Sequence, residues 1–253
     1  MIRIILDGCL GTMGHVITDT FAKSDQVKIV AGVDIRGDQN GSMPYPVYTD
    51  WKDVREEADC AVDFAAAPAV DGTVEACAGR KLPLVLGTTG LSEKQLEKVR
   101  KLSQTVPLVQ SYNFSLGINT MAKIIREITP VLAGAGFDIE IVEKHHNQKA
   151  DAPSGTAIML ADAANEAENG RYHFVTGRSE VRRKRDPDEI GISSVRGGTI
   201  VGAHDVIFAG EDEVLELNHQ AFSKAIFARG ALAAVLFLRG KKPGYYSMAD
   251  VIG

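Results

Sequence analysis

The segment from Glu143 to Ala157, EKHHNQKADAPSGTA, collects groups that can transfer protons and bind anions. The imidazoles of His145 and His146 can change protonation near neutral pH. Lys149, a few residues further on, adds a mobile positive charge. Together, these groups could bind a carboxylated substrate and give it a proton.

The end of the segment has the composition of a helix start. Asp151 or Ser154 can serve as the N-cap, and Pro153 is tolerated because the first turn leaves its N–H groups unbonded. The backbone N–H groups of Ser154, Gly155 and Thr156 would then lie at the positive end of the helix dipole. We therefore predict a carboxylate-binding site at this helix start.

Two other interpretations of this segment stay open. The neighbouring histidines could be metal ligands, but adjacent positions rarely converge on one metal and no ligand partners occur at a suitable spacing. The segment could also be a solvated polar loop. The combination of charged groups with a helix start favours the ligand site, and we predict no metal.

A glycine-rich loop near the N-terminus is typical of dinucleotide binding. Gly8, Gly11 and Gly14 follow an apolar strand and precede a helical pattern, which is the context that the motif requires. Glycines let the backbone approach a pyrophosphate, and the following helix presents its positive end to the anion. The spacing is GxxGxxG rather than the usual GxGxxG, so a tight turn without a ligand is the alternative.

The second apolar strand ends at Asp34, where a carboxylate can bind a ribose hydroxyl. Arg36 follows it, and an arginine at this place can instead bind a 2′-phosphate. An ordinary strand-end acid is the alternative for Asp34. The predicted cofactor is therefore NADH or NADPH, without a choice between them.

Two further loops follow later strands of the same pattern. GTTG, residues 87–90, and SYNF, residues 111–114, come after the fourth and fifth apolar runs. Ligands bind at the carboxyl ends of parallel strands, so we expect both loops to line the dinucleotide site. Each could also be a simple turn.

The elements that must position these residues alternate between strand and helix over about residues 1–114. Five short apolar runs have the composition of strands buried on both faces of a sheet: RIILDG, VKIVAGVDI, CAVDFAAA, LPLVLGTTG and PLVQSYNF. Helical patterns separate several of them, and one begins with a capping box formed by Ser92 and Gln95. This order predicts an α/β fold with a Rossmann-type, doubly wound parallel sheet.

The pattern changes after residue 114. A 3.6-residue apolar period predicts a long helix over 118–132, and strict alternation in FDIEIVE predicts a strand with one buried face. Gly-rich turns separate further strands, with a hairpin turn at 210–213. We expect a second, α+β domain with a mixed or antiparallel sheet. An apolar helix at about 223–238 follows and could belong to either domain.

Composition limits the class of protein. The 253 residues carry a formal net charge of −5, which disfavours nucleic-acid binding. The one basic cluster, Arg182 to Arg185, precedes acidic residues and is interpreted as a solvated loop. The 3 cysteines lack CxxC spacing and fit reduced thiols, and the sequence has neither a signal-peptide pattern nor a membrane-spanning run. We expect a cytoplasmic protein with no membrane partner.

The segment at 143–157 resembles the signature of the 4-hydroxy-tetrahydrodipicolinate reductase family, also called dihydrodipicolinate reductase. Every fixed position of the family pattern, E-x-H-H-x-x-K-x-D-x-P-S-G-T-A, is present. GCLGTMG, VDF, GTTG, NFSLGIN and RGGTIVGAH also resemble family segments, so the likeness spans nearly the whole chain. SYNF departs from the pattern, because the family more often has Ala-Pro-Asn-Phe there.

The resemblance implies a role for each residue of the predicted sites. His145 would donate or accept the proton, and Lys149 would be the second catalytic group. The substrate carboxylates would contact His146, Gly155 and Thr156. The dinucleotide would contact Gly8, Cys9, Leu10, Gly11, Thr12, Met13, Asp34, Gly87, Thr88, Thr89, Ser111, Tyr112, Asn113 and Phe114.

The implied reaction is hydride transfer from NADH or NADPH to a cyclic, imine-containing dicarboxylate, giving tetrahydrodipicolinate in lysine and diaminopimelate biosynthesis. Residues 1–114 and 221–253 would form the dinucleotide-binding domain, and 115–220 the substrate-binding and oligomerisation domain of a homotetramer. Two alternatives stay open: another two-domain NAD(P)-dependent reductase, such as an amino-acid dehydrogenase, and a non-catalytic sensor. The segment at 143–157 disfavours the first, and a sensor does not need His145.

Overall fold

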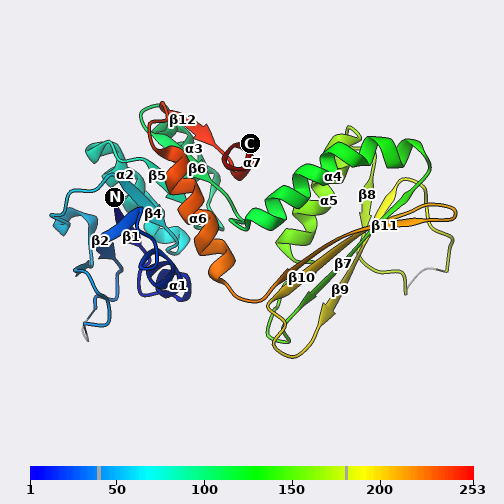
Figure 1. Ribbon diagram of the computed structural model, residues 1–253, viewed down its shortest axis with the longest axis horizontal. Helices are drawn as coiled ribbons and strands as arrows, with labels where there is room; N and C mark the ends of the chain where they lie inside the picture. The colour runs from blue at the N-terminus through cyan, green and yellow to red at the C-terminus, as the bar shows by residue number, and fades with distance from the viewer. Residues whose placement is uncertain (39–40, 180–181) are drawn as a thin grey trace. The chain divides into compact units, whose positions relative to one another are not determined.

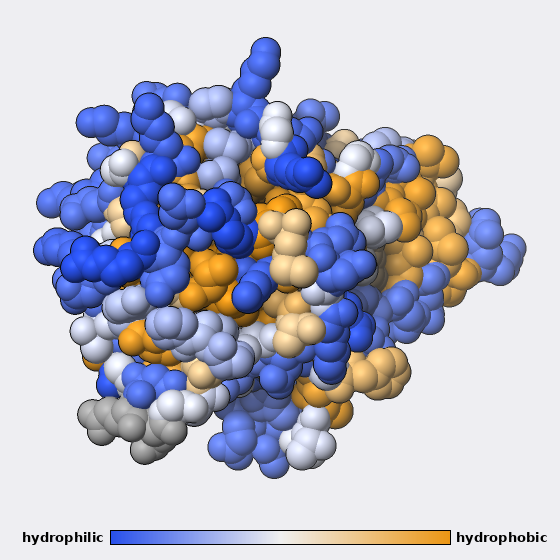
Figure 2. Space-filling model, turned by 60° about the vertical axis from the view of Figure 1, so that its left-hand side comes forward, coloured by the Kyte–Doolittle hydropathy of each residue, from blue (hydrophilic) through white to orange (hydrophobic). Residues whose placement is uncertain are grey.

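A computed structural model describes residues 1–38, 41–179 and 182–253 (Figure 1). The chain folds into two compact units: unit 1 comprises residues 1–116 and 224–253, and unit 2 comprises residues 117–223. Within the described ranges, the helices are too short or too polar to cross a membrane. The face turned forward in Figure 2 is largely hydrophilic, with hydrophobic residues in smaller patches, as is usual for a surface in water.

Unit 1 is built on a seven-stranded sheet in which the strand order is β12-β6-β5-β4-β1-β2-β3 and every neighbouring pair is parallel. The strands are β1 (Ile2–Asp7), β2 (Val27–Val33), β3 (Val47–Tyr48), β4 (Cys60–Asp63), β5 (Leu84–Leu86), β6 (Pro107–Gln110) and β12 (Gly244–Tyr246). The central strands β1, β4 and β5 are buried on both faces, which explains their continuous apolar runs.

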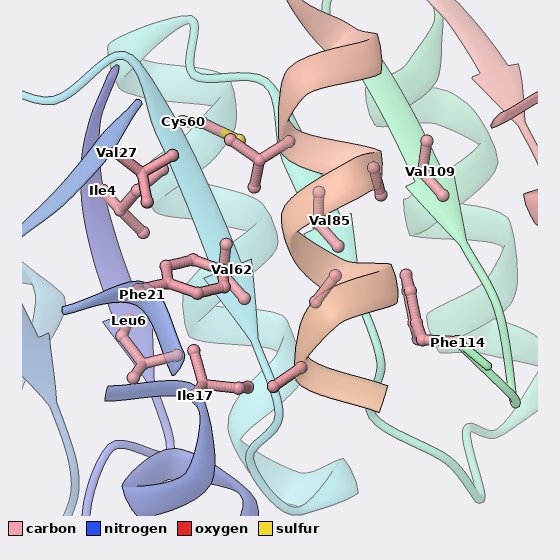
Figure 3. Close-up of a cluster of buried hydrophobic side chains, with 14 of the residues drawn as sticks. Ile4, Leu6, Ile17, Phe21, Val27, Cys60, Val62, Val85, Val109 and Phe114 are labelled. Carbon is pink, nitrogen blue, oxygen red and sulfur yellow. The ribbon is translucent and has the colours of Figure 1, made fainter. Parts of the chain in front are cut away.

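Helices cover both faces of this sheet. They are α1 (Thr12–Phe21), α2 (Val70–Arg80), α3 (Glu93–Ser103), α6 (Ala225–Leu238) and α7 (Met248–Ile252), with short 3₁₀ helices at Trp51–Asp53 and Ala67–Ala69. Side chains of α1 and α6 pack on one face and those of α2 and α3 on the other. Figure 3 shows the first cluster, in which Val85 lies at α6 and Leu6 lies near Ile17 of α1. The predicted doubly wound α/β fold is confirmed.

Unit 2 contains a five-stranded mixed sheet with the order β11-β10-β7-β9-β8. Its strands are β7 (Asp138–His145), β8 (His173–Val175), β9 (Glu189–Arg196), β10 (Gly202–Ala209) and β11 (Val214–Ala221), and its helices are α4 (Leu116–Gly134) and α5 (Gly155–Ala167). β7 runs parallel to β9 and antiparallel to β10. The predicted hairpin is present, because Gly210 N donates to Glu213 O over 2.8 Å between β10 and β11.

Strand β7 confirms the predicted alternation and extends it. Its buried positions are Ile139, Ile141, Glu143 and His145, and the two isoleucines pack with residues of α4 and α5. Side chains of alternate strand residues point to the same face, so the same pattern that buries the isoleucines also buries a carboxylate and an imidazole. The candidate site begins at the last residues of this alternation.

The basic cluster at 182–185 is a loop in which Arg182, Arg183 and Lys184 are exposed, whereas Arg185 is not, so the interpretation as a solvated loop is wrong for Arg185. Arg185 is only 18% exposed in its side chain and forms ion pairs with Asp138 and Glu140. Arg183 pairs over 3.1 Å with Glu189, which is fully buried. Glu189 follows the cluster in the sequence, but Asp138 and Glu140 come from β7, so the local sequence could not indicate them.

Candidate active site

His145, the last residue of β7, lies at the centre of a hydrogen-bonded group in unit 2. Its Nδ1 atom is 2.6 Å from Oε2 of Glu143, and the residue is 9% exposed. Glu143 and His145 are two residues apart on one strand, so they project from the same face of the sheet. The strand therefore fixes the pairing of the two side chains.

Glu143 is held by donors from three different segments. Arg196, at the end of β9, donates to both carboxylate oxygens over 2.7 Å, and Ser154 N donates to Oε1 over 3.0 Å. Burial alone would raise the pKa of Glu143. The hydrogen bonds from Arg196, Ser194, His145 and Ser154 outweigh that effect and lower the pKa to about 2. Glu143 is therefore an ionised carboxylate at neutral pH.

The start of α5 is built around Ser154, which is the N-cap of the helix. Ala157 N donates to Ser154 Oγ over 3.1 Å, and the same oxygen lies 3.1 Å from Nε2 of His204. Both polar groups of Ser154 are thus bonded within the chain, so its role is to form the helix start. Gly155 is exposed, and no other part of the chain comes within 4 Å of the position that a Cβ would take. A ligand can therefore approach the first turn of α5 at Gly155 and Thr156.

Lys149 and His146 lie on the loop between β7 and α5. Lys149 Nζ is 2.8 Å from Oδ1 of Asp151, and its hydrogen bond lowers the pKa of the Asp151 carboxyl. His146 is half-buried, and its carbonyl accepts a hydrogen bond from Lys149 N. The loop after β9 is attached to the same place, because Gly197 N donates to His145 O over 2.9 Å. The structure thus brings the predicted residues together with a segment that lies far from them in the sequence.

His204 is a neighbour that sequence reasoning missed. Its ring centroid lies 5.2 Å from that of His145 in an edge-on arrangement. Burial, followed by the nearby His145, lowers the pKa of His204 to about 4, so this histidine is neutral at physiological pH. It is the last residue of the family-like segment RGGTIVGAH, and that resemblance is the signal that could have found it.

The glycine loop of unit 1 has the backbone geometry that a phosphate-binding turn requires. Gly8 has φ +75°, and a Cβ there would lie 2.7 Å from the backbone of Ala65. A Cβ at Gly14 would overlap the carbonyl oxygens of Gly8 and Cys9, so α1 can pack tightly on the loop only with glycine. The N-cap of α1 is Gly11, which leaves the N-terminus of the helix accessible to an anion. The loop therefore fits a dinucleotide pyrophosphate.

Asp34 and Arg36 form an ion pair beside this loop. Arg36 Nε donates to Oδ1 of Asp34 over 2.9 Å and Nη2 donates to Oδ2 over 3.0 Å, while Leu10 N donates to Oδ2 over 3.1 Å. The hydrogen bond from Arg36 is the largest of the effects that lower the pKa of Asp34. Both candidate ribose-binding groups thus lie at the loop, and the structure keeps both NADH and NADPH as options.

Two family models match this chain. The model described as dihydrodipicolinate reductase, N-terminus, matches residues 2–114, and the model described as dihydrodipicolinate reductase, C-terminus, matches residues 117–252. Together they cover nearly the whole sequence. The chain belongs to the dihydrodipicolinate reductase family.

Individual relatives agree with this assignment to the dihydrodipicolinate reductase family. A 4-hydroxy-tetrahydrodipicolinate reductase from Caldanaerobacter subterraneus subsp. tengcongensis is 48% identical over 100% of this chain and 98% of its own. One from Clostridium botulinum is 46% identical over 100% and 99%. A dipicolinate-bound dihydrodipicolinate reductase from Paenisporosarcina sp. TG-14 superposes with a TM-score of 0.81, at 25% identity over 100% of both chains. A myo-inositol dehydrogenase from Corynebacterium glutamicum, at 14% identity over 100% of this chain and 92% of its own, has a TM-score of 0.61 and shares the fold alone.

The remaining residues that the dihydrodipicolinate reductase resemblance assigned to the dinucleotide differ in their exposure. Thr12, Thr89 and Tyr112 are exposed, and Leu10, Met13, Gly87 and Ser111 are half-buried. Cys9, Thr88, Asn113 and Phe114 are buried. The buried side chains have internal partners, such as Asp63 for Thr88 and the Phe64 ring for Phe114, so they shape the loops from beneath.

The described part of the chain contains no group of side chains that could bind a metal ion. Over residues 1–38, 41–179 and 182–253, no three His, Cys, Asp or Glu side chains lie together as ligands would. The three cysteines, Cys9, Cys60 and Cys77, are buried free thiols.

Proposed function

We propose that this chain is a 4-hydroxy-tetrahydrodipicolinate reductase. It reduces a cyclic, imine-containing dicarboxylate with NADH or NADPH and yields tetrahydrodipicolinate, with loss of water, in lysine and diaminopimelate biosynthesis. The observation that carries the proposal is the match of both family models over residues 2–114 and 117–252, together with a relative 48% identical over the full chain. The geometry of the site in unit 2 supports it.

Unit 1 is proposed to bind the dinucleotide. The amides of the loop from Gly8 to Met13 and the N-terminus of α1 hold the pyrophosphate, because they present donors and a positive dipole end. Asp34 holds the ribose hydroxyls, or Arg36 holds a 2′-phosphate. The loops at 87–89 and 111–114 form the rest of the site. When bound, the reduced nicotinamide supplies the hydride.

Unit 2 is proposed to bind the dicarboxylate substrate. The first turn of α5, at Gly155 and Thr156, binds a carboxylate through its amides, and His146 and Lys149 add polar and cationic contacts. His145 exchanges the proton, because it is the imidazole held next to this turn. The relative from Paenisporosarcina is a dipicolinate-bound enzyme, and dipicolinate is a ligand of the same dicarboxylate class.

The assembly and location follow as further parts of the proposal. The protein acts in the cytoplasm as a homotetramer joined through the sheet of unit 2, with no nucleic-acid or membrane partner. The net charge of −5 supports the absence of nucleic acid, since a binder needs a basic face.

A coupled assay tests the activity. Aspartate semialdehyde, pyruvate and the preceding condensing enzyme generate the substrate, and the absorbance of NADH or NADPH should then fall on addition of this protein. Turnover should decrease about 10²–10⁴-fold in His145→Ala and strongly in Lys149→Ala, with dinucleotide binding near normal.

The matched control is His173→Ala, which removes an exposed histidine from β8 and should leave turnover unchanged. Dinucleotide binding without any loss of absorbance in the wild type would identify a sensor instead. Turnover like that of the wild type in both site variants would remove the catalytic assignment.

A further inference from the structure

We infer that Glu143 is a positioning residue that fixes the tautomer of His145, so that Nε2 is the atom that exchanges the proton with the substrate. The inference rests on the proposed function for the substrate, but its structural part concerns only the protein. Three observations carry it: the donors around Glu143, the contact of Glu143 with Nδ1, and the lack of a side chain at Gly202 beside Nε2.

The donors around Glu143 require a carboxylate. Oε1 accepts from Arg196 Nη2 and Ser154 N, and Oε2 accepts from Arg196 Nη1. A protonated carboxyl group is a poorer acceptor for these donors and loses the attraction of its charge for Arg196. An ionised group accepts from all of them, and a bidentate arginine is its best partner.

The contact with His145 then determines where the imidazole carries its hydrogen. A carboxylate can only accept a hydrogen bond, so the 2.6 Å contact with Oε2 requires a hydrogen on Nδ1 of His145. In the neutral ring, Nε2 is left with the lone pair. When the ring is protonated, the second hydrogen is on Nε2, and that is the hydrogen it can give to a substrate.

The residue beside Nε2 is a glycine. This glycine is Gly202, the first residue of β10. If it carried a Cβ, that atom would lie 3.1 Å from His145 Nε2 and 3.4 Å from His145 Cδ2. A side chain there would press against the proton-exchanging edge of the ring. At Gly202 the strand therefore places no side chain against this edge.

The other histidine of the group does not compete for this role. His204 Nε2 faces the Ser154 hydroxyl over 3.1 Å, and its ring stands edge-on to that of His145. It supports the plane of the His145 ring, while Glu143 sets its rotation and its tautomer. Nε2 of His145 is thus ready to exchange a proton before any ligand binds. The side chains around the ring hold it in place, so the site does not have to rearrange during the reaction.

The first test uses the wild-type protein and no substrate. Long-range ¹H–¹⁵N NMR spectra of the imidazoles, with His145 assigned by its loss in His145→Gln, should show neutral His145 with hydrogen on Nδ1 and none on Nε2. The opposite tautomer, or a mixture of the two, would overturn the inference. This result does not depend on the proposed reaction, so the two can fail separately.

The second test separates positioning from structure by kinetics. Glu143→Gln keeps the shape but can present its amide hydrogen to Nδ1, which reverses the tautomer. We expect kcat to decrease about 10²-fold or more, with KM for the substrate and the dinucleotide Kd within about threefold. The same spectrum should show hydrogen moved from Nδ1 to Nε2. An unchanged kcat in a folded variant would overturn the inference, and if the variant does not fold the wild-type spectrum decides.

The matched control is Glu189→Gln. Glu189 is also a fully buried glutamate in the same sheet and also pairs with two arginines, Arg178 and Arg183. Its ion-pair partners are these arginines rather than an imidazole, so its variant should lose stability without the change in tautomer. A loss of kcat in Glu189→Gln equal to that in Glu143→Gln would show that any buried charge has this effect and would overturn the inference.

A substitution on the other side of the ring gives a third, independent test. Gly202→Ala places a methyl group against Nε2 and should decrease kcat at least about tenfold while leaving the Nδ1 hydrogen in place. Gly177→Ala, at an exposed glycine with nothing within 4 Å of its Cβ position, is the control and should behave as the wild type. An unaffected kcat in Gly202→Ala would exclude Nε2 as the exchanging atom.

Discussion

Two carboxyl groups, those of Asp7 and Asp63, lie side by side at the ends of β1 and β4 in unit 1, and both are almost fully buried. Trp51 Nε1 donates to Asp7 Oδ2 over 2.7 Å, and the Thr73 hydroxyl donates to the same oxygen. Within the described part of the chain, Asp63 Oδ2 has no hydrogen-bond partner. Burial, followed by the charge of Asp63, raises the pKa of Asp7 from 3.8 to about 7.

The raised pKa of Asp7 predicts a stability that falls as pH rises. Below pH 3.8 both the folded and the unfolded chain bind the proton, so the group has no effect. Between that pH and about 7 the unfolded chain has lost the proton and the folded chain keeps it, and the cost grows to at most about 4 kcal/mol. Unit 1 should therefore unfold at lower urea concentration at pH 8 than at pH 5, as followed by fluorescence of Trp51, the single tryptophan.

Asp7→Asn tests the cause of this pH dependence. The amide removes the ionisation but keeps an acceptor for Trp51, so the variant should be more stable than the wild type at pH 8 and lose most of the advantage near pH 4. Asp25→Asn, at an exposed site of the same unit, should follow the wild-type curve. A wild type equally stable at both pH values, with an unimproved variant, would show that Asp7 does not hold its proton.

Many individual residues of the candidate site could be predicted from the sequence, because they are close together along the chain. His145, Lys149, Gly155 and Thr156 occur within one segment. Arg196 and His204 begin and end the family-like segment RGGTIVGAH, but they were assigned no role. Their link to Glu143 and Ser154 arises only when β9 and β10 pair with β7, so the sequence did not show this pairing.

The start of α1 illustrates how a single element depends on the absence of a side chain. A Cβ at Gly14 would meet backbone carbonyl oxygens of the preceding loop, which cannot move aside as a flexible side chain can. Gly14→Ala should therefore decrease the stability of unit 1 by about 1–3 kcal/mol or more, in spite of the better helix propensity of alanine. Urea unfolding followed by Trp51 fluorescence measures this change.

Gly72→Ala is the control for the change in helix propensity. Gly72 lies inside α2, and no atom comes within 4 Å of its Cβ position. Its variant should gain about 0.5–1 kcal/mol, because alanine loses less backbone entropy than glycine. Equal effects at the two positions would show that the close approach of α1 to the loop does not determine the residue at Gly14.

Long and strongly patterned elements could be predicted from the sequence, and short edge strands could not. The capping box of α3, the helix α4 and the alternation of β7 all appear as expected. β3 and β12 were missed, because Val47–Tyr48 and Gly244–Tyr246 are too short to show a periodicity. Their pairing depends on the exposed edges that β2 and β6 offer to any nearby extended chain.

The molecule as a whole is proposed to be a tetramer, and one face of the sheet in unit 2 is suited to this. Helices α4 and α5 pack on the face that carries Ile139 and Ile141. By the same alternation, Val142, Val195 and Ile207 lie on the other face, and Val195 is 44% exposed. Val195→Asp should break the assembly, because an interface of roughly 1,200–2,000 Å² would bury the new charge.

Light scattering during gel filtration measures the effect. The wild type should have the mass of four chains and Val195→Asp the mass of one or two, while its fold persists because Lys144 is the register partner of that position. Val131→Asp, at a valine 70% exposed on α4, is the matched control and should stay tetrameric. A monomeric wild type, or an intact tetramer in Val195→Asp, would contradict the predicted interface.

The position of α6 in unit 1 affects how the chain emerges from the ribosome. Unit 2 is continuous in sequence, but unit 1 receives α6 only after residues 117–223 have been made. Until then, α1 is the one helix among the described residues that can cover this face of β1, β4 and β5, on which Leu6, Val62 and Val85 lie. Unit 2 can thus complete its fold before unit 1 does, although it is synthesised later than residues 1–116. In the meantime unit 1 exposes an apolar surface of the kind that chaperones bind.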